Sequence, residues 1–254
     1  MASQENSSFS FLNVRRRIAL FALVCGITAL RSDAQQPGGS LNAAAAAANP
    51  QVVLEVGDVY LPGSRVYAFV GKTGLGHEHG VIGQIKRGRI DLAALRDPGG
   101  LEFDMATFVA DTPEARKFVR LPGETDASTQ QQVNANMKGP DVLAVARYPT
   151  STLVIKQIAK LDKPSQRNLP QYQLNGDFTL HGVTKPIQVV AEAEEQSGWI
   201  HLRGGFTMLQ TQFGITPFTK AFGAVGVADQ LTVWGDLWIA KQRQVASRAP
   251  EAPR

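Results

Sequence analysis

Residues 171–181, QYQLNGDFTLH, alternate strictly between apolar and polar positions. Polar side chains occupy every odd position from Gln171 to Thr179, and His181 ends the run. A period of two places the two sets on opposite faces of an extended chain, so this stretch predicts a β-strand with one buried face. The expected buried set is Tyr172, Leu174, Gly176, Phe178 and Leu180.

The same kind of alternation recurs between residues 51 and 241, where turn signals such as Pro98-Gly99-Gly100 separate the apolar runs. Residues 52–61 either begin the first strand or add another. Eight half-buried strands with little helix favour a closed antiparallel barrel or a sandwich over a parallel α/β sheet. The fold class is therefore all-β with one or two short helices. The predicted strands are 64–72, 80–92, 101–109, 151–160, 171–181, 185–196, 198–208 and 230–241.

Two short helices interrupt this pattern. Thr112-Pro113-Glu114 combines an N-cap residue, a proline at the first helical position and an acid in the first turn, which predicts a helix start. Residues 129–138 form the second predicted helix, with Ser128 as its cap and a stop near Gly139-Pro140. Val133 and Met137 are spaced i, i+4, so they share one side of it.

The N-terminus predicts an exported protein. Arg15-Arg16-Arg17 precedes an apolar run of 13 residues, 18–30, and Ser32-Asp33-Ala34 fits a cleavage site. The run is shorter than the roughly 20 residues of a membrane-spanning helix. We therefore expect residues 1–34 to be a cleaved signal peptide and the mature protein to be periplasmic or secreted.

Composition divides the rest of the chain into three parts. Residues 35–50 are a low-complexity linker, residues 51–241 form the β-barrel domain, and residues 242–254 are expected to be a disordered tail. Cys25 is the one cysteine and lies in the predicted signal peptide, so the expected mature protein has neither a disulfide nor a thiolate site.

Charge and motifs exclude several classes of function. Four of the 26 Lys and Arg residues and two of the 22 Asp and Glu residues lie within 1–34, so the remainder carries a formal charge of +2. That balance, without a basic cluster, argues against nucleic acid as a partner. No Gly-x-Ser-x-Gly elbow or phosphate-binding glycine loop is present, and Glu102 and Asp104 fit the wet face of a strand. We expect a binding protein that is not an enzyme and needs no cofactor.

Histidines give the main alternative, a metal-binding protein or metal-dependent enzyme. His77 and His79 would project to the same side of an extended chain, and His181 or His201 could complete a site with Asp104. Two histidines at this spacing are a weak signal, and polar residues are common in a glycine-rich turn such as 74–80. The favoured prediction is that no metal is bound.

Glycine positions bear on whether the barrel is hollow. Gly176, Gly204 and Gly235 share the parity of the apolar residues in their strands. An eight-stranded barrel is just wide enough to be filled by side chains or to hold one small ligand, so inward glycines could make room. They could equally mark bulges or tight bends. The spacing leaves both interpretations open.

A third hypothesis is a scaffold acting through its surface. Trp234 and Trp238 share the opposite face of their strand, where they could meet a partner or make transient contact with a membrane. A covered outer face of the barrel is the favoured interpretation.

Residues 176–187, GDFTLHGVTKPI, resemble the signature of the YceI-like polyisoprenoid-binding family. Further landmarks follow the family order, namely Tyr60…Pro62-x-Ser64-x-Val66, His77-x-His79, Arg147-Tyr148-Pro149 and Phe213-Gly214-Ile215. The resemblance implies an extended, lipocalin-like antiparallel eight-stranded barrel that binds a polyisoprenoid or another amphiphilic lipid. The apolar residues expected to line its ligand site are Phe103, Met105, Phe178, Leu180, Ile200, Phe206 and Leu237.

Two departures from the family pattern concern the polar contacts of the barrel mouth. An Arg-Asp-x-His-Leu-Arg-like stretch is replaced by a longer segment, about 113–143. Thr211 or Gln212 stands where the family commonly has an arginine. The identity of the ligand's head group is therefore left open by the resemblance.

Overall fold

The computed structural model describes residues 52–246. The predicted signal peptide 1–34, the linker 35–50 and the last eight residues of the predicted tail lie outside the described residues.

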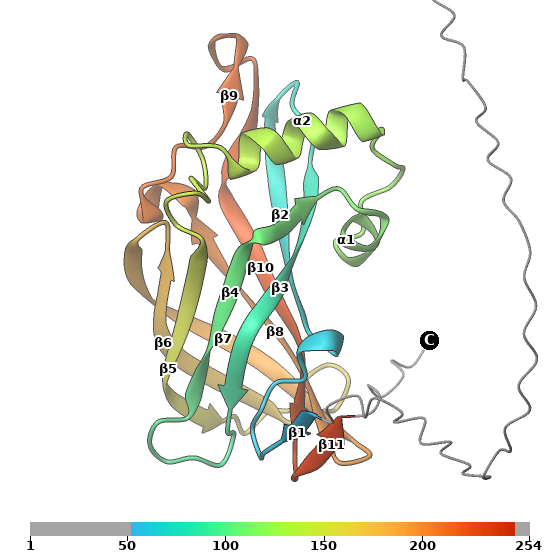
Figure 1. Ribbon diagram of the computed structural model, residues 1–254, viewed down its shortest axis with the longest axis vertical. Helices are drawn as coiled ribbons and strands as arrows, with labels where there is room; N and C mark the ends of the chain where they lie inside the picture. The colour runs from blue at the N-terminus through green and yellow to red at the C-terminus, as the bar shows by residue number, and fades with distance from the viewer. Residues whose placement is uncertain (1–51, 247–254) are drawn as a thin grey trace, which may run out of the picture. The chain divides into compact units, whose positions relative to one another are not determined.

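Eight antiparallel strands form a closed barrel (Figure 1). Each strand pairs with the next, and β10 pairs with both β8 and β2, so the sheet has no free edge between its first and last strands. The predicted fold class and strand count are confirmed. The barrel strands are β2 (Arg65–Gly74), β3 (His79–Ile90), β4 (Gly99–Ala110), β5 (Thr150–Lys160), β6 (Gln171–Leu180), β7 (Val183–Gln196), β8 (Trp199–Leu209) and β10 (Val225–Ala240).

Short strands and turns lie at both ends of the barrel. β1 (Val52–Leu54) pairs with β11 (Gln244–Ala246), and β9 (Thr219–Lys220) pairs with the start of β10. Three 3-10 turns, η1 (Leu61–Gly63), η2 (Gln210–Phe213) and η3 (Ala221–Gly223), complete the set.

The strand boundaries differ from the sequence prediction by one or two residues in most strands, and the larger differences concern β11 and β10. β11 lies within the residues that the sequence assigned to the tail. It is held by backbone pairing with β1, and its three residues carry no apolar pattern that would predict a strand. β10 begins at Val225 instead of residue 230. Its register against β2 shifts between Val227 and Leu231, and this irregularity interrupts the alternation that marks a strand in the sequence.

Both predicted helices are present. α1 (Pro113–Phe118) begins as expected, with the Thr112 hydroxyl accepting a hydrogen bond from the backbone N–H of Ala115 at 3.1 Å. α2 (Ala127–Lys138) begins earlier than predicted, and Ser128 as its cap was wrong. Asp126 caps it instead, and its carboxylate accepts from the backbone N–H groups of Ser128 and Thr129. A carboxylate is at least as good an N-cap acceptor as a serine hydroxyl, so the earlier residue takes this position.

α1 packs on the outer face of the barrel. The ring of Phe118 stacks on Tyr67 with centroids 3.7 Å apart, and Trp234 meets Phe118 edge to face. The Tyr67 hydroxyl donates a 2.7 Å hydrogen bond to Glu114. Burial and this carboxylate raise the pKa of Tyr67 above its ordinary value, so the hydroxyl stays a donor.

The two tryptophans do lie on the same outer face. Trp238 is 3% exposed and belongs to a small core with Tyr60 and Trp199, beside η1. Because these contacts are made within the chain, Trp238 offers no free surface to a partner.

The barrel interior contains open space at both ends and packed side chains between them. Along β8, Ile200 lines a separate pocket at the β1 end, Leu202 is buried in the core, and Phe206 and Met208 line a cavity at the α2 end. β6 and β10 show the same order. A solid layer that includes Ile155, Leu174, Leu202 and Leu237 therefore separates the two spaces.

Two of the three inward glycines are explained by close backbone approach. A Cβ on Gly176 would lie 2.4 Å from the Val154 carbonyl, and one on Gly204 would lie 2.5 Å from both the Val190 carbonyl and the Ala191 side chain. Only Gly235 has ordinary room around it. The interpretation that these glycines create the hollow is therefore wrong for Gly176 and Gly204, which allow neighbouring strands to bend closely past one another.

Candidate ligand-binding site

An apolar cavity of about 200 Å³ occupies the α2 end of the barrel. Its walls come from the inward faces of β2, β3, β4, β5, β6, β8 and β10, and nearly all of its lining side chains are apolar. Five residues predicted from the sequence lie together on this lining, namely Phe103, Met105, Phe178, Leu180 and Phe206.

The two other predicted residues lie elsewhere. Leu237 is 4% exposed and belongs to the solid layer, and Ile200 lines the pocket at the opposite end. Both side chains do face inward. The alternation in the sequence indicates which face a residue takes but not how far along the barrel it lies. As ligand contacts, the predicted residues stay predictions.

Phe178 connects the aromatic side chains of the cavity floor. Its ring meets Phe103, Phe206 and Phe213 edge to face, with centroids 6.3, 5.5 and 5.6 Å away. Phe213 belongs to η2 and is 1% exposed. The three contacts have the edge-to-face geometry that aromatic pairs prefer, so they stabilise the position of the Phe178 ring.

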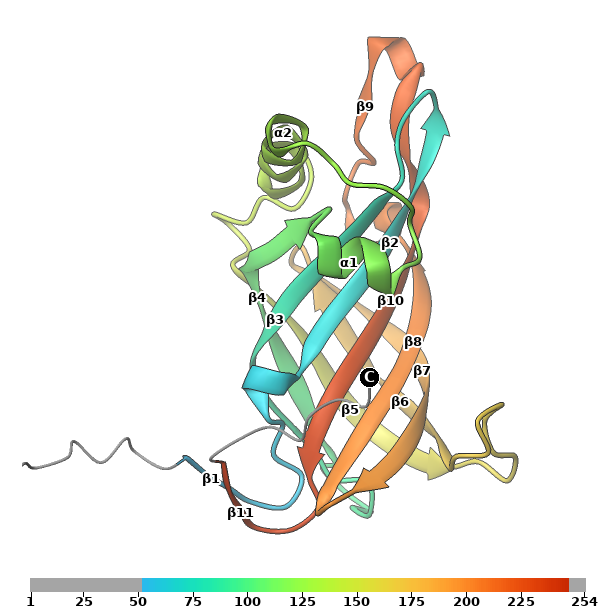
Figure 2. The same ribbon diagram turned by 90° about the vertical axis from the view of Figure 1, so that its right-hand side faces the viewer.

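α2 forms the roof of the cavity. Val133 and Met137, the apolar pair predicted to share one side of this helix, both line the cavity together with Asn136. Figure 1 shows the helix lying across the end of the barrel, and Figure 2 shows it end-on near the end of β4. The segment that departs from the family pattern therefore supplies part of the lining.

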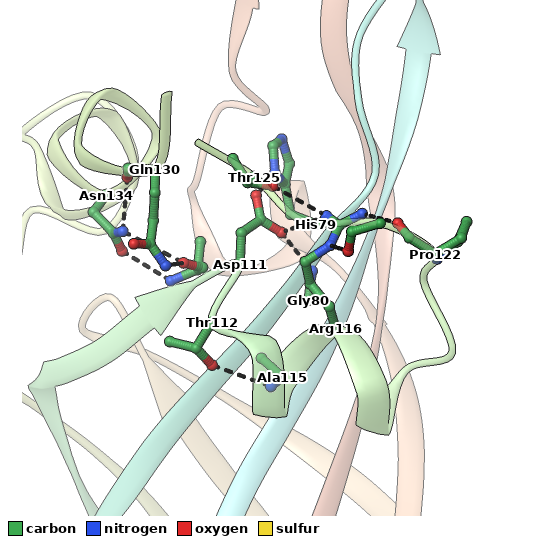
Figure 3. Close-up of polar contacts among 12 residues, drawn as sticks. His79, Gly80, Asp111, Thr112, Ala115, Arg116, Pro122, Thr125, Gln130 and Asn134 are labelled. Atoms are coloured by element: carbon green, nitrogen blue, oxygen red, sulfur yellow. Dashed lines mark hydrogen bonds and ion pairs between the residues drawn. The ribbon is translucent and has the colours of Figure 1, made fainter. Parts of the chain in front are cut away.

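Polar side chains attach α2 to the last residues of β4. β4 pairs with β5 only through residues 99–104, which leaves the backbone of 106–110 without a strand on that side. The Asn134 amide oxygen accepts from the Ala110 N–H at 2.8 Å, and Gln130 Nε2 donates to the Ala110 carbonyl at 3.0 Å (Figure 3). Lys138 Nζ donates to the Ala106 carbonyl at 2.7 Å. α2 thus satisfies an unpaired strand edge instead of burying a broad apolar face.

A polar cleft of about 550 Å³ adjoins the cavity. Lys72 and Lys220 lie on its strand side, and Glu124 lies on the α1–α2 connection. The residues that line both spaces are His79, Val133, Phe218 and Val227. The cavity and cleft together therefore offer an apolar space next to a charged one.

His79 and Asp111 form the polar group at this junction (Figure 3). His79 Nδ1 lies 2.6 Å from Asp111 Oδ2, and the Asp111 carboxylate also accepts from the Gly80 N–H and from Arg116 at 3.2 Å each. Burial alone would raise the pKa of Asp111, but the hydrogen bond and charge of His79, with Gly80 and Arg116, hold it below its ordinary value. The aspartate is 1% exposed and stays ionised. Sequence reasoning missed this pair, because Asp111 lies 32 residues from His79 and outside any motif.

The histidines proposed for a metal site are dispersed. His79 pairs with Asp111, His181 packs 4.5 Å from the Tyr148 ring, and His201 pairs with Asp236 on the outer face. His77 is exposed in the polar cleft, and the Asp104 carboxylate accepts from the N–H of Ala106, two residues further along β4. Within residues 52–246, no three His, Cys, Asp or Glu side chains are grouped as metal ligands.

No helix in the described part of the chain is long and apolar enough to cross a membrane.

Comparison with known proteins supplies a family match. The model of the YceI-like domain matches residues 64–237, more than half of the chain. Relatives named UPF0312 protein, from Pseudomonas savastanoi pv. phaseolicola and Pseudomonas syringae pv. tomato, are each 31% identical over 116 residues. Those matches cover 43% of this chain and 57% of each relative, less than two thirds of the relatives' length.

A solved structure shares the fold. Burkholderia cenocepacia BcnA superposes with a TM-score of 0.50 and 18% identity, over 72% of this chain and 100% of that one. At this identity the likeness concerns the fold alone.

Proposed function

The chain belongs to the YceI-like domain family, and we propose that it binds an apolar or amphiphilic lipid inside its barrel. The observation that carries this proposal is the cavity of about 200 Å³ with an almost entirely apolar lining. Burial of apolar ligand surface contributes roughly 25 cal/mol per Å², so affinity would come from contact area and would require no acid, base or cofactor. The family resemblance adds an isoprenoid chain as the preferred chemical class.

Cavity size limits how such a ligand sits. Pockets for drug-sized ligands usually measure about 300–1,000 Å³, and the cavity measures about 200 Å³. The adjoining cleft adds about 550 Å³ of more polar space. We therefore place an apolar chain in the cavity and the polar end of the molecule toward the cleft.

A cavity-filling variant tests the proposal. Ala68 lines the cavity from β2, and Ala68→Phe would fill much of it. We expect the wild type to bind the neutral fluorescent probe N-phenyl-1-naphthylamine and release it to farnesol, and the variant to bind at least tenfold more weakly. Thr232→Phe, on the outward parity of β10, is the control that changes volume outside the barrel. Equal probe binding by all three proteins would contradict an interior site.

Export to the periplasm or the exterior is part of the proposal. It is supported by the arginine-led apolar run of residues 15–34. Fractionation of cells that express the full chain, with mass measurement of the mature protein, tests it. A protein that keeps residues 1–34 in the cytoplasmic fraction would contradict it.

Transient contact with a membrane is a second element of the proposal. Leu75 and Phe222 are 80% and 113% exposed, and their turns are joined by a hydrogen bond from the Leu75 N–H to the Ala224 carbonyl at 2.9 Å. Figure 1 shows this end of β2 and β9 extending at the same end of the barrel as α2. Phe222 has a left-handed φ of 55°, an uncommon conformation for a bulky residue. Exposed apolar side chains beside Lys72 and Lys220 suit an anionic lipid surface.

A further inference from the structure

His79 lies on the cavity wall where the cavity meets the cleft. The polar side chains that line the cavity are His79, Asn136, Ser151 and Gln210, and His79 is the one among them that also lines the cleft. Its side chain is 14% exposed. Any chain-like ligand that runs from the cavity to the cleft therefore passes this imidazole.

The hydrogen-bonding role of His79 is set by Asp111. The ionised Asp111 carboxylate can only accept, so the proton between the two groups belongs to Nδ1 of the histidine. In the neutral imidazole, Nε2 then carries a lone pair and acts as an acceptor. Within the described structure, Nε2 makes no hydrogen bond to protein.

Each of the other three polar side chains of the lining makes one hydrogen bond to a nearby group. The Ser151 hydroxyl donates to the Thr179 carbonyl at 2.6 Å, Gln210 Nε2 donates to the Ala228 carbonyl at 2.8 Å, and Asn136 Oδ1 accepts from Gln132 at 3.1 Å. His79 is thus an oriented acceptor at the point where the surroundings change from apolar to polar.

We propose that His79 Nε2 accepts a hydrogen bond from the hydroxyl group of a long-chain alcohol or phenol whose chain lies in the cavity. This inference rests on the proposed function and names the class of head group. Asp111 is the positioning residue, because it fixes the proton of His79 without touching the ligand.

The test compares farnesol with farnesyl methyl ether, which has the same chain but cannot donate a hydrogen bond. Wild-type protein should bind the alcohol about fivefold more tightly, as expected for one hydrogen bond in a buried site. His79→Phe should bind both probes equally while it retains affinity for the ether. His77→Phe is the matched control, since His77 lies in the cleft but outside the cavity lining, and it should keep the wild-type preference.

Asp111→Asn provides a second test, since a purely structural role of Asp111 would not change the preference between alcohol and ether. Asn tolerates the left-handed φ of 59° at this position, and its amide can donate to Nδ1. The imidazole can then carry its proton on Nε2, and the preference should shift from the alcohol toward the ether.

Three outcomes would overturn the inference. One is an alcohol preference that survives His79→Phe. Another is no preference in the wild type when both probes bind, which would leave the proposed function intact. The third is tighter binding of farnesoic acid that is lost in Lys72→Gln/Lys220→Gln, which would assign the head group to the lysines. Failure of both neutral probes to bind the wild type would reject the proposed function itself.

Discussion

The rings of Phe178 and Phe206 meet edge to face with centroids 5.5 Å apart, although their strands, β6 and β8, are not neighbours in the barrel. The contact therefore crosses the interior. Phe103 from β4 reaches the same ring from the other side. Together these side chains form the floor on which the cavity rests, above the solid layer that includes Leu202 and Leu237.

Phe178→Asp should remove both the floor and much of the stability. Phe178 is 7% exposed, and truncation of a buried phenylalanine costs about 3–5 kcal/mol before the penalty of an unpaired buried charge. We expect the free energy of unfolding, measured by chemical denaturation, to fall by at least about 4 kcal/mol, with loss of probe binding. His181→Ala, one residue beyond the end of β6, should change that free energy by less than about 1.5 kcal/mol. Equal losses in the two variants would contradict the inward position of Phe178.

Asn134→Ala should loosen the roof of the cavity. It removes the acceptor of the Ala110 N–H, and an unsatisfied buried group costs about 1–3 kcal/mol. We expect faster hydrogen exchange at the Ala110 amide and faster release of a bound apolar probe. Gln131→Ala, at an exposed position of the same helix, is the control. A release rate unchanged by Asn134→Ala would show that α2 does not gate the cavity.

Acid should weaken the contact between α1 and β3. Because the folded protein holds the pKa of Asp111 below its ordinary value of about 3.9, this group stabilises the fold above pH 4. That contribution is lost as the pH falls through the folded pKa. We expect the free energy of unfolding to decline below about pH 4 in the wild type, and less steeply in Asp111→Asn.

The carboxylates of Asp126 and Asp229 do not affect the comparison between the wild type and Asp111→Asn. Hydrogen bonds from Ser128 and Thr129, and from Thr211, also lower their pKa values, but both groups are present in the wild type and the variant. Identical pH profiles for the two proteins would show that Asp111 is not preferentially stabilised as a carboxylate.

Leu75→Ser/Phe222→Ser should reduce binding to anionic vesicles. Burial of a large apolar side chain contributes about 1.5–3 kcal/mol, so the double variant should bind phosphatidylglycerol vesicles at least about tenfold more weakly in a flotation assay. Leu95→Ser is the matched control, since Leu95 is 99% exposed in the β3–β4 connection at the opposite end of the barrel. Wild-type binding should also weaken with added salt, because lysines contribute. An effect of Leu95→Ser equal to that of the double variant would contradict docking through the Leu75–Phe222 end.

The sequence was sufficient for the barrel and for the inward set of side chains. In β6, ten residues of alternation predict both the strand and its buried face. The same pattern carries no information on height along the barrel, which is why Ile200 and Leu237 were grouped with Phe206. Parity also could not separate a glycine that opens space from one that admits a neighbouring strand, as at Gly176 and Gly204.

Other features depend on contacts between distant segments. The His79–Asp111 pair joins the start of β3 to the end of β4, and no local motif signals it. α2 shows the same limit: Val133 and Met137 marked its inner side, but its attachment to the Ala110 backbone follows from an unpaired strand edge that exists only after the barrel closes.

The most direct test of the account is native mass spectrometry of the mature protein purified from an exporting host without detergent, followed by organic extraction. We predict a mass excess of one lipid per barrel, which disappears on extraction and is absent from Ala68→Phe. A wild-type protein of bare polypeptide mass that also fails to take up added farnesol would contradict the proposal that the barrel holds an apolar guest.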